Sequence, residues 1–197
     1  MPVGVNPRPP GAQAPSTGVD FLTPPDLLVA LGTLRVRKDG EYTLGADPFD
    51  LDPCSSYRQP WPTARVMHTI YEDGTTRDWQ GEVWLNPPYG KELYLWLARL
   101  ATHGNGMALL YARTDTIGFG EWVWEKADAI YFFKGRLRFH APVTGALLRD
   151  ARGGLMNSGG PMCLACYGNK SVERARRLKD SDYPGTLVSL RAVRKGK

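Results

Sequence analysis

The sequence predicts an α/β fold built around a central sheet. Short apolar runs typical of strands alternate along the chain with runs whose apolar residues have helical spacing, and this alternation is typical of α/β sheets. One run is especially informative, because the apolar residues 83–85 are followed by two consecutive prolines, Pro87 and Pro88. Proline cannot donate a ladder hydrogen bond, so the chain must leave the sheet here. It leaves at the carboxyl end of the strand, where open α/β sheets bind their ligands.

The composition indicates one globular domain with a mildly basic charge. The 197 residues are 42% hydrophobic and 11% aromatic, which suits a single core, and we place the domain at residues 20–190. Lys and Arg number 25 against 20 for Asp and Glu, a net charge of +5. This balance is compatible with a nucleic-acid partner but is common in proteins without one. Residues 191–197 are predicted to be a basic tail, because they contain four positive charges and no acidic residue.

The first ordered element is expected just after residue 20. Residues 1–19 are rich in Pro, Gly and Ala with almost no large apolar residue, so we expect a loose, disordered arm. Thr23 can cap a short helix whose first positions are Pro24 and Pro25. A helix start alone is enough to explain these residues.

A short acidic strand is predicted next. Phe49 and Leu51 alternate with Asp50 and Asp52 before Pro53 ends the run, a pattern typical of a strand with a carboxylate at its tip. Such a carboxylate can accept hydrogen bonds from the ribose hydroxyls of a cofactor or pair with an ammonium group. An acidic turn is the alternative interpretation.

Apolar periodicity predicts the remaining elements. Residues 55–78 and 141–160 show little periodicity and are predicted to be loops. Helices are expected from 93 to near Gly104, at 119–127 and at 172–178, and strands at 106–112, 129–133, 162–167 and 187–193, the last at a sheet edge. Residues 134–139 are predicted to turn into a further strand in which basic and apolar residues alternate.

The three cysteines do not indicate a disulfide framework or a metal site. An odd number of cysteines argues against a secreted, disulfide-bonded protein. Cys163 and Cys166 have metal-like spacing, but no second pair of matching spacing exists and both lie in an apolar run, so we expect small buried hydrophobes and no metal. Neither a signal peptide nor an apolar run long enough to span a bilayer is found. The expected location is cytoplasmic, with no membrane partner.

The loop Asn86-Pro87-Pro88-Tyr89 suits methylation of a planar nitrogen. The exocyclic amine of adenine is a poor nucleophile because its lone pair is delocalised into the ring. The Asn86 side-chain oxygen and the Pro87 carbonyl could accept both amine hydrogens and favour the geometry that develops during attack. The Tyr89 ring offers a face for the base, worth roughly 1–3 kcal/mol. A rigid proline turn with Tyr89 as packing explains the loop, taken alone, about equally well.

Five segments, in this order along the chain, carry a resemblance to a known family. They are Phe21-Leu22-Thr23-Pro24, Phe49-Asp50-Leu51-Asp52-Pro53, Trp84-Leu85-Asn86-Pro87-Pro88-Tyr89, Ala112-Arg113-Thr114-Asp115-Thr116 and Lys134-Gly135-Arg136-Leu137-Arg138-Phe139. Over roughly residues 20–167 the chain resembles the phage-type DNA N6-adenine methyltransferases. The resemblance implies a class I, Rossmann-like fold: a mostly parallel sheet with helices on both faces and an antiparallel element near its end.

The resemblance also implies a set of site residues. Asn86, Pro87, Pro88 and Tyr89 match the catalytic loop. Phe21, Thr23, Pro24, Asp50, Asp52 and Pro53 match regions that line the S-adenosylmethionine pocket of related enzymes. The target adenine is expected to be flipped out of double-stranded DNA, with Phe139 as a candidate for its second face. Lys134, Arg136 and Arg138 are candidates for phosphate contacts, although a basic solvent-facing surface is nearly as good an interpretation.

The chain departs from the wider methyltransferase pattern in two places. Cys54-Ser55-Ser56 stands where the cofactor loop usually carries Gly-x-Gly. Asn rather than Asp opens the catalytic loop, which the chemistry permits because both side chains carry an oxygen acceptor. Asn is also the form found in enzymes that methylate the amide of protein glutamine. Base specificity would have to come from residues 55–78, the 141–160 loop or the basic carboxyl terminus.

These observations predict a monomeric phage- or prophage-derived enzyme in a bacterial host that methylates N6 of adenine in DNA. The same chemistry on RNA adenine or on a protein glutamine is the first alternative. The second is a catalytically inactive nucleic-acid-binding module, suggested by the reduced cofactor loop and the basic tail.

Overall fold

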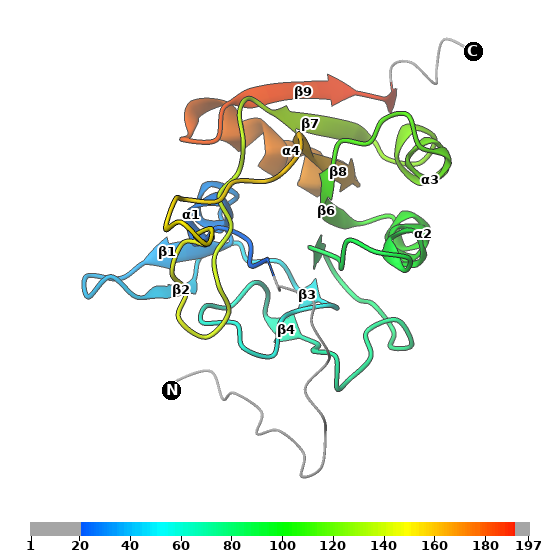
Figure 1. Cartoon of the computed structure of the whole chain (residues 1–197). Helices are drawn as coiled ribbons and strands as arrows, with labels where there is room; N and C mark the ends of the chain where they lie inside the picture. The colour runs from blue at the N-terminus through cyan, green and yellow to red at the C-terminus, as the bar shows by residue number, and fades with distance from the viewer. Residues whose placement is uncertain (1–20, 192–197) are drawn as a thin grey trace.

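The computed structural model describes residues 21–191 of the chain (Figure 1). The predicted arm at 1–19 and all of the predicted basic tail except Arg191 lie outside the described residues. The helical elements are α1 (Pro25–Ala30), α2 (Leu93–His103), α3 (Ile117–Phe119), the π-helical turn η1 (Gly120–Trp124), α4 (Asn169–Arg177) and the 3-10 turn η2 (Leu178–Asp180). The strands are β1 (Leu34–Val36), β2 (Tyr42–Leu44), β3 (Leu51–Asp52), β4 (Val66–Met67), β5 (Val83–Leu85), β6 (Gly106–Tyr111), β7 (Ala129–Phe133), β8 (Met162–Tyr167) and β9 (Gly185–Ser189).

The main sheet, as described within residues 21–191, has seven strands in the order β4-β3-β5-β6-β8-β7-β9. The first four run parallel to one another. Strand β8 is antiparallel to both of its neighbours, β6 and β7, so β7 runs in the same direction as β6. Strand β9 is antiparallel to β7 and closes the sheet at that side. The sheet is therefore mixed, with five of its seven described strands in one direction.

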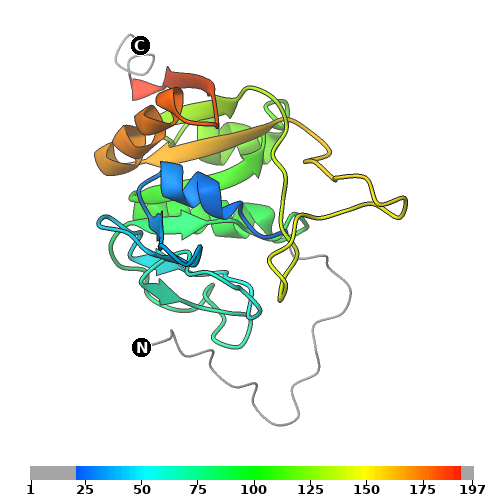
Figure 2. The same ribbon diagram turned by 90° about the vertical axis from the view of Figure 1, so that its left-hand side faces the viewer.

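Helices cover both faces of this sheet (Figures 1 and 2). One core cluster joins α1, α4 and η2 to side chains such as Trp84, Met107 and Leu164. The other joins α2, α3 and η1 to the alternate residues of the same strands, such as Leu85 and Ala108. Successive strand residues point to opposite faces, and both faces here are covered, so β5, β6 and β8 are apolar almost throughout. The predicted α/β fold with helices on both faces is confirmed.

The cysteines of β8 illustrate this alternation. Cys163 packs in the cluster with α2, whereas Cys166 packs in the cluster with α1 and α4. The two thiols thus lie on opposite faces of the sheet and cannot share one ion. Burial raises the pKa of Cys163 to about 12. Both behave as small buried side chains, as the sequence predicts.

Several predicted elements are confirmed at nearly their expected positions. The helix predicted from residue 93 is α2, which ends at Gly104 in the left-handed conformation that favours glycine. The strands predicted at 106–112, 129–133 and 162–167 are β6, β7 and β8. The predicted edge strand is β9, although it begins earlier than expected, at Gly185.

Other predictions are wrong in detail. The stretch after α1, where no helix or strand is predicted, forms the antiparallel hairpin β1–β2. The helix predicted at 119–127 is the short α3 followed by η1. Thr23 makes no capping hydrogen bond, because Pro24 occupies the N-cap position of α1 and Thr23 lies one residue before it.

The segment 134–139 is extended but is not a strand of the sheet. Its backbone makes separate contacts instead of a continuous ladder: the Ser158 amide donates to the Leu137 carbonyl at 2.7 Å and the Leu148 amide to the Phe139 carbonyl at 3.0 Å. The predicted alternation is nonetheless present, since Leu137 and Phe139 are buried and the basic residues between and before them are exposed.

A buried ionic network ties α4 to the amino end of the sheet. Arg174 is fully buried, and its Nε and Nη2 both donate to the carboxylate of Glu82, the residue before β5, at 2.8–2.9 Å. Its Nη1 donates to the carbonyls of Leu31 and Asp47, at 2.8 and 2.7 Å. Lys170 completes the network at 3.1 Å from Glu82 and 2.9 Å from the Asp47 carboxylate. A bidentate, fully hydrogen-bonded geometry is what a buried ion pair needs to offset its desolvation.

No helix between residues 21 and 191 combines the length and the apolar character that crossing a bilayer requires.

Candidate active site

The Asn86–Tyr89 loop lies at the carboxyl ends of the parallel strands, as the two prolines predict. Strand β5 ends at Leu85, and the loop follows directly. Strand β3 runs parallel beside it, with Leu51 opposite Val83, so the turn after β3 reaches the same edge. The contact between them is direct, because the Cys54 thiol donates to the Asn86 backbone carbonyl at 3.4 Å. This edge is where open α/β sheets hold ligands.

Hydrogen bonds on both sides fix the Asn86 side chain. Its Nδ2 donates to the Phe21 carbonyl at 2.8 Å, and the Tyr89 hydroxyl lies 3.3 Å from its Oδ1. A carbonyl can only accept, so the nitrogen must face Phe21 and the oxygen must face Tyr89. The half-buried amide therefore presents its acceptor in one defined direction.

Tyr89 is held by its hydroxyl. That group is also 3.1 Å from the Leu109 carbonyl of β6, and its single proton can go to only one of the two acceptors at a time. When it goes to Leu109, the Asn86 Oδ1 is available to another donor. Burial, with smaller effects of Tyr111 and Cys163, raises the pKa of Tyr89 well above 10.0, so the hydroxyl stays protonated at neutral pH. The ring packs 4.8 Å from that of Tyr111.

Asp52 shapes the turn after β3. It is 3% exposed, and its carboxylate accepts hydrogen bonds from the Thr63 hydroxyl and from the Cys54 amide, the latter at 3.0 Å. Burial raises its pKa to about 6, against these hydrogen bonds, which lower it. Among residues 21–191 no ion pair to this carboxylate is found. Asp52 thus fixes the Pro53-Cys54 turn beside Asn86.

The structure does not bring Asp50 to this edge. Its carboxylate accepts from the Glu82 amide at 2.7 Å and lies 3.6 Å from Arg65. Glu82 precedes β5, so Asp50 lies at the amino end of the sheet, a strand's length from Asn86. Of the two predicted acidic residues, only Asp52 neighbours the loop.

The segment before α1 joins the loop to residues 134–140. Leu22 pairs with His140 through two backbone hydrogen bonds of 3.1 and 3.2 Å, and the Phe21 ring lies 5.6 Å from that of Phe139. Phe139 and Thr23 are both buried. The structure therefore gathers Phe21, Asn86 and Phe139 in one region, but it leaves the Phe139 ring covered.

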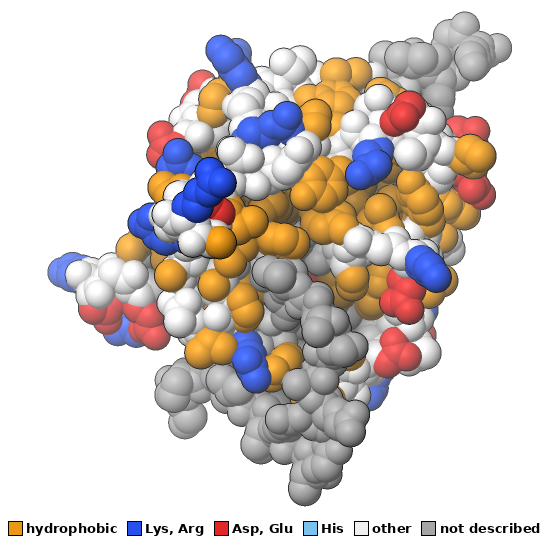
Figure 3. Space-filling model, viewed as in Figure 1, with side chains coloured by type: hydrophobic (Ala, Val, Ile, Leu, Met, Phe, Trp, Pro, Cys, Tyr) orange, Lys and Arg blue, Asp and Glu red, His pale blue; other side chains and the backbone are white. Residues whose placement is uncertain are grey.

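The three predicted basic residues lie at the surface of the same segment. Lys134, Arg136 and Arg138 are all exposed. Figure 3 shows Lys and Arg side chains gathered where residues 134–160 run in Figure 1, next to apolar side chains.

Two participants could not be inferred from the sequence. Tyr111 ends the apolar strand β6 and reads as core, although it packs on Tyr89. Thr63 lies in a segment without periodicity, and nothing local indicates that its hydroxyl bonds Asp52.

Comparison with protein-family models, with curated proteins and with solved structures gives no match to this chain.

Proposed function

We propose that this protein transfers a methyl group from S-adenosylmethionine to N6 of adenine in DNA. The observation that carries the proposal is the Asn86 side chain, whose amide oxygen is oriented by the Phe21 carbonyl on one side and by the Tyr89 hydroxyl on the other. It lies directly after a buried parallel strand, at the ligand-binding edge of the sheet.

This arrangement supplies preorganised acceptors for an amine. The Asn86 Oδ1 can accept one amine hydrogen while Tyr89 donates to Leu109, and the Pro87 carbonyl can accept the other. Fixed acceptors favour the nitrogen geometry that develops during attack and need no reorganisation at that moment. The protonated Tyr89 cannot act as a base, and the reaction needs none, because the amine becomes acidic once it carries the methyl group.

The order of strands also supports the proposal. The resemblance to class I methyltransferases implies an antiparallel element near the end of a mostly parallel sheet, and β8 and β9 are such elements. The turn after β3 is where such a fold would hold its methyl donor. S-adenosylmethionine supplies the electrophilic methyl when bound.

The residues at the carboxyl ends of the strands can hold S-adenosylmethionine, but without the glycine-rich loop that is usual for this donor. The amides of Cys54 and Ser55 are already hydrogen-bonded, to Asp52 and to the His68 carbonyl at 2.8 Å, so this turn does not provide the free amides of a glycine-rich loop. Within the described residues 21–191, the neighbouring 55–78 segment instead holds buried side-chain atoms without a hydrogen-bond partner: Gln59 Nε2, Trp61 Nε1 and the Tyr71 hydroxyl. Buried polar groups without partners are rare and suit a polar ligand. We propose that the donor binds beside this segment, with Pro53 and Phe21 as candidate contacts.

The experiment measures labelled methyl transfer from S-adenosylmethionine to unmethylated double-stranded DNA, followed by nucleoside analysis. We expect N6-methyladenine, and a loss of about 100- to 1,000-fold in turnover for Asn86→Ala. The matched control is Asn105→Ala, because Asn105 also donates through Nδ2 to a backbone carbonyl, that of Gly81 at 2.9 Å, but at the amino end of the sheet. Each variant loses one such bond, about 1 kcal/mol of stability.

Equal turnover in the two variants would remove Asn86 from the chemistry. Label in RNA or in protein glutamine, with none in DNA, would keep the site and change its substrate. A protein that binds DNA but accepts no label, and whose melting temperature S-adenosylmethionine leaves unchanged, would be the inactive binding module.

A further inference from the structure

A surface cavity of about 360 Å³ lies outside the Asn86–Tyr89 loop, none of whose residues lines it. Its walls come from the start of α1, from residues 133–140 and from the turn before β9. The Phe21–Phe139 pair contacts Asn86 through the Phe21 carbonyl, while Pro24 and Arg138, each close in sequence to one member of that pair, line the cavity. The segments that carry Phe21 and Phe139 therefore connect the cavity to the proposed site.

The middle of the cavity is aromatic and apolar. Tyr183 and Phe133 pack edge to face with ring centroids 6.5 Å apart, and buried Leu137 lies below them. The Tyr131 hydroxyl donates to the Tyr183 carbonyl at 2.9 Å, which fixes the backbone that carries the ring. A half-buried, anchored tyrosine ring is a surface on which a nucleic-acid base can stack.

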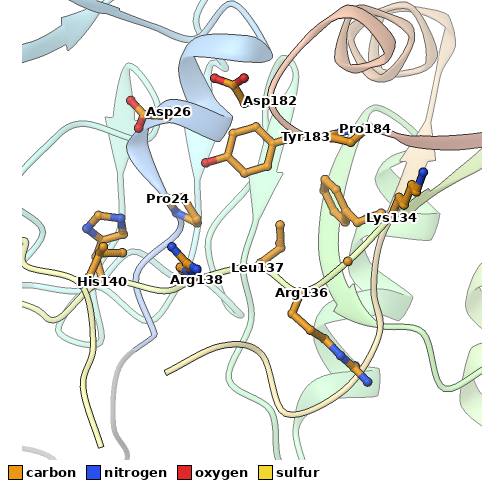
Figure 4. Close-up of a pocket in the computed structure, with 13 residues that line it drawn as sticks. Pro24, Asp26, Lys134, Arg136, Leu137, Arg138, His140, Asp182, Tyr183 and Pro184 are labelled. Atoms are coloured by element: carbon orange, nitrogen blue, oxygen red, sulfur yellow. The ribbon is translucent and has the colours of Figure 1, made fainter. Parts of the chain in front are cut away.

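The acidic and the basic side chains of the cavity lie on different sides of it. In Figure 4 the Asp26 and Asp182 carboxylates lie on one side of the Tyr183 ring, and Lys134, Arg136 and Arg138 lie on the other. Asp26 already accepts a hydrogen bond from the Tyr42 hydroxyl at 2.8 Å. Within residues 21–191 no hydrogen bond or ion pair to Asp182 is found, so its oxygens are open to a ligand.

We propose that this cavity binds one nucleotide of the DNA strand, next to the adenine that is flipped out. The base stacks on Tyr183, an exocyclic amine of the base donates to Asp182, and the phosphate lies among the three basic side chains. A carboxylate accepts from the amine of a base, which explains an acidic group inside an otherwise basic surface. The inference rests on the proposed function, which supplies the DNA strand and its neighbouring target base.

The test compares Asp182→Asn with Asp180→Asn by fluorescence anisotropy of a labelled duplex bound to the full chain. Asp180 is also exposed and lies in η2, outside the cavity. If the two aspartates only repel phosphate, both variants bind DNA as tightly as the unmodified protein or more tightly. We expect Asp182→Asn to weaken binding by about tenfold, because it loses a charged acceptor for a base, and Asp180→Asn not to weaken it. Equal behaviour of the two variants would overturn the proposal.

A second pair of variants tests the phosphate end. Arg138→Gln should weaken binding and lower the slope of log K against log salt by about one. Arg35→Gln, which removes an exposed arginine on β1, should leave that slope unchanged. A smaller slope in both variants would mean a general basic surface and no cavity contact.

Binding of adenosine monophosphate, measured without the duplex, distinguishes the source of the nucleotide. No binding at millimolar concentration, together with weaker duplex binding by Asp182→Asn, supports the strand. Binding to the unmodified protein but not to Asp182→Asn, with equal duplex binding by the two proteins, would assign the cavity to a free nucleotide and overturn its assignment to the strand.

Because binding is measured without the methyl donor, this readout is independent of transfer. Weakened binding in Asp182→Asn together with no methylation of DNA would keep the cavity and reject the proposed function. Methylation together with equal binding by the two aspartate variants would keep the proposed function and reject the cavity.

Discussion

The amino and carboxyl ends of the parallel strands in the main sheet hold polar groups in opposite ways. At the amino edge, Glu82 and Arg174 are buried with their charges paired and every contact satisfied by protein. At the carboxyl ends, Asp52 is also buried but accepts hydrogen bonds from neutral donors, with no ion pair found among residues 21–191, and Asn86 keeps an acceptor that Tyr89 can release. A fully satisfied network can only hold structure together, whereas an edge with spare acceptors can receive a ligand.

The pKa values of the aspartates also shift in opposite directions at the two ends of the strands. Burial alone would raise the pKa of Asp47 at the amino edge, but the Lys170 hydrogen bond and the charges of Arg174 and Arg177 lower it below 3.8. The pKa of Asp52 at the carboxyl edge is raised instead. The amino edge thus loses stability when Asp47 is protonated, and the carboxyl edge loses stability when Asp52 ionises.

The largest expected effect is at the amino edge. Arg174→Leu should lower the free energy of unfolding by about 3–5 kcal/mol, because it leaves the buried Glu82 carboxylate without its bidentate partner. The control is Arg176→Leu on the same helix. The Arg176 side chain is 60% exposed and pairs with Glu173 at 3.3 Å, so its loss should stay below about 0.5 kcal/mol. Urea denaturation measures both, and similar midpoints would mean that the network does not stabilise this edge.

A smaller effect, dependent on pH, is expected at the carboxyl edge. Between pH 4 and 7 the native state binds the Asp52 proton more tightly than the unfolded chain, so stability should fall as pH rises through about 6. The shift from 3.8 to about 6 corresponds to roughly 2–3 kcal/mol. Asp52→Asn cannot ionise, so it should remove this fall and be the more stable protein at pH 7. Denaturation at pH 4 and pH 7 measures the difference, and parallel pH profiles for the two proteins would contradict it.

The smallest effect concerns the hydroxyl that links β6 to the loop. Tyr89→Phe loses the contacts to Asn86 and Leu109, at about 1 kcal/mol, and should lower methyl transfer about fivefold. Tyr89→Ala also loses the ring and its stacking, worth roughly 1–3 kcal/mol, and should lower transfer further. Steady-state transfer rates of the two variants separate the role of the hydroxyl from that of the ring. Equal losses of rate would assign the whole effect to the hydroxyl.

The sequence predicts the elements whose cause is local. Strands β6 and β8 are apolar on both faces, and the two prolines after β5 force the chain out of the sheet, so these features are visible in short windows. Hairpin β1–β2 also has a local signal, which the prediction missed: Asp39-Gly40 lies between the alternating runs Leu34-Arg35-Val36 and Tyr42-Thr43-Leu44.

Pairings between distant residues are invisible to local patterns. Arg174 meets Glu82 across 92 positions, and Asn86 meets the Phe21 carbonyl across 65. Asp50 and Asp52 look equivalent in sequence, but their spacing of two residues places them at opposite ends of a short strand. The loop that carries the proposed chemistry was therefore predictable, whereas the contacts that orient it were not.

The position of β8 has a consequence for biosynthesis. The ribosome releases β6 and β7 before the strand that lies between them, because Met162–Tyr167 is translated after both. In the native sheet β6 and β7 are not neighbours, so each keeps an unpaired edge until β8 has been synthesised. Closure of the sheet is thus a late, long-range event, and a chain stopped before Met162 lacks the interior of its sheet and not merely its rim.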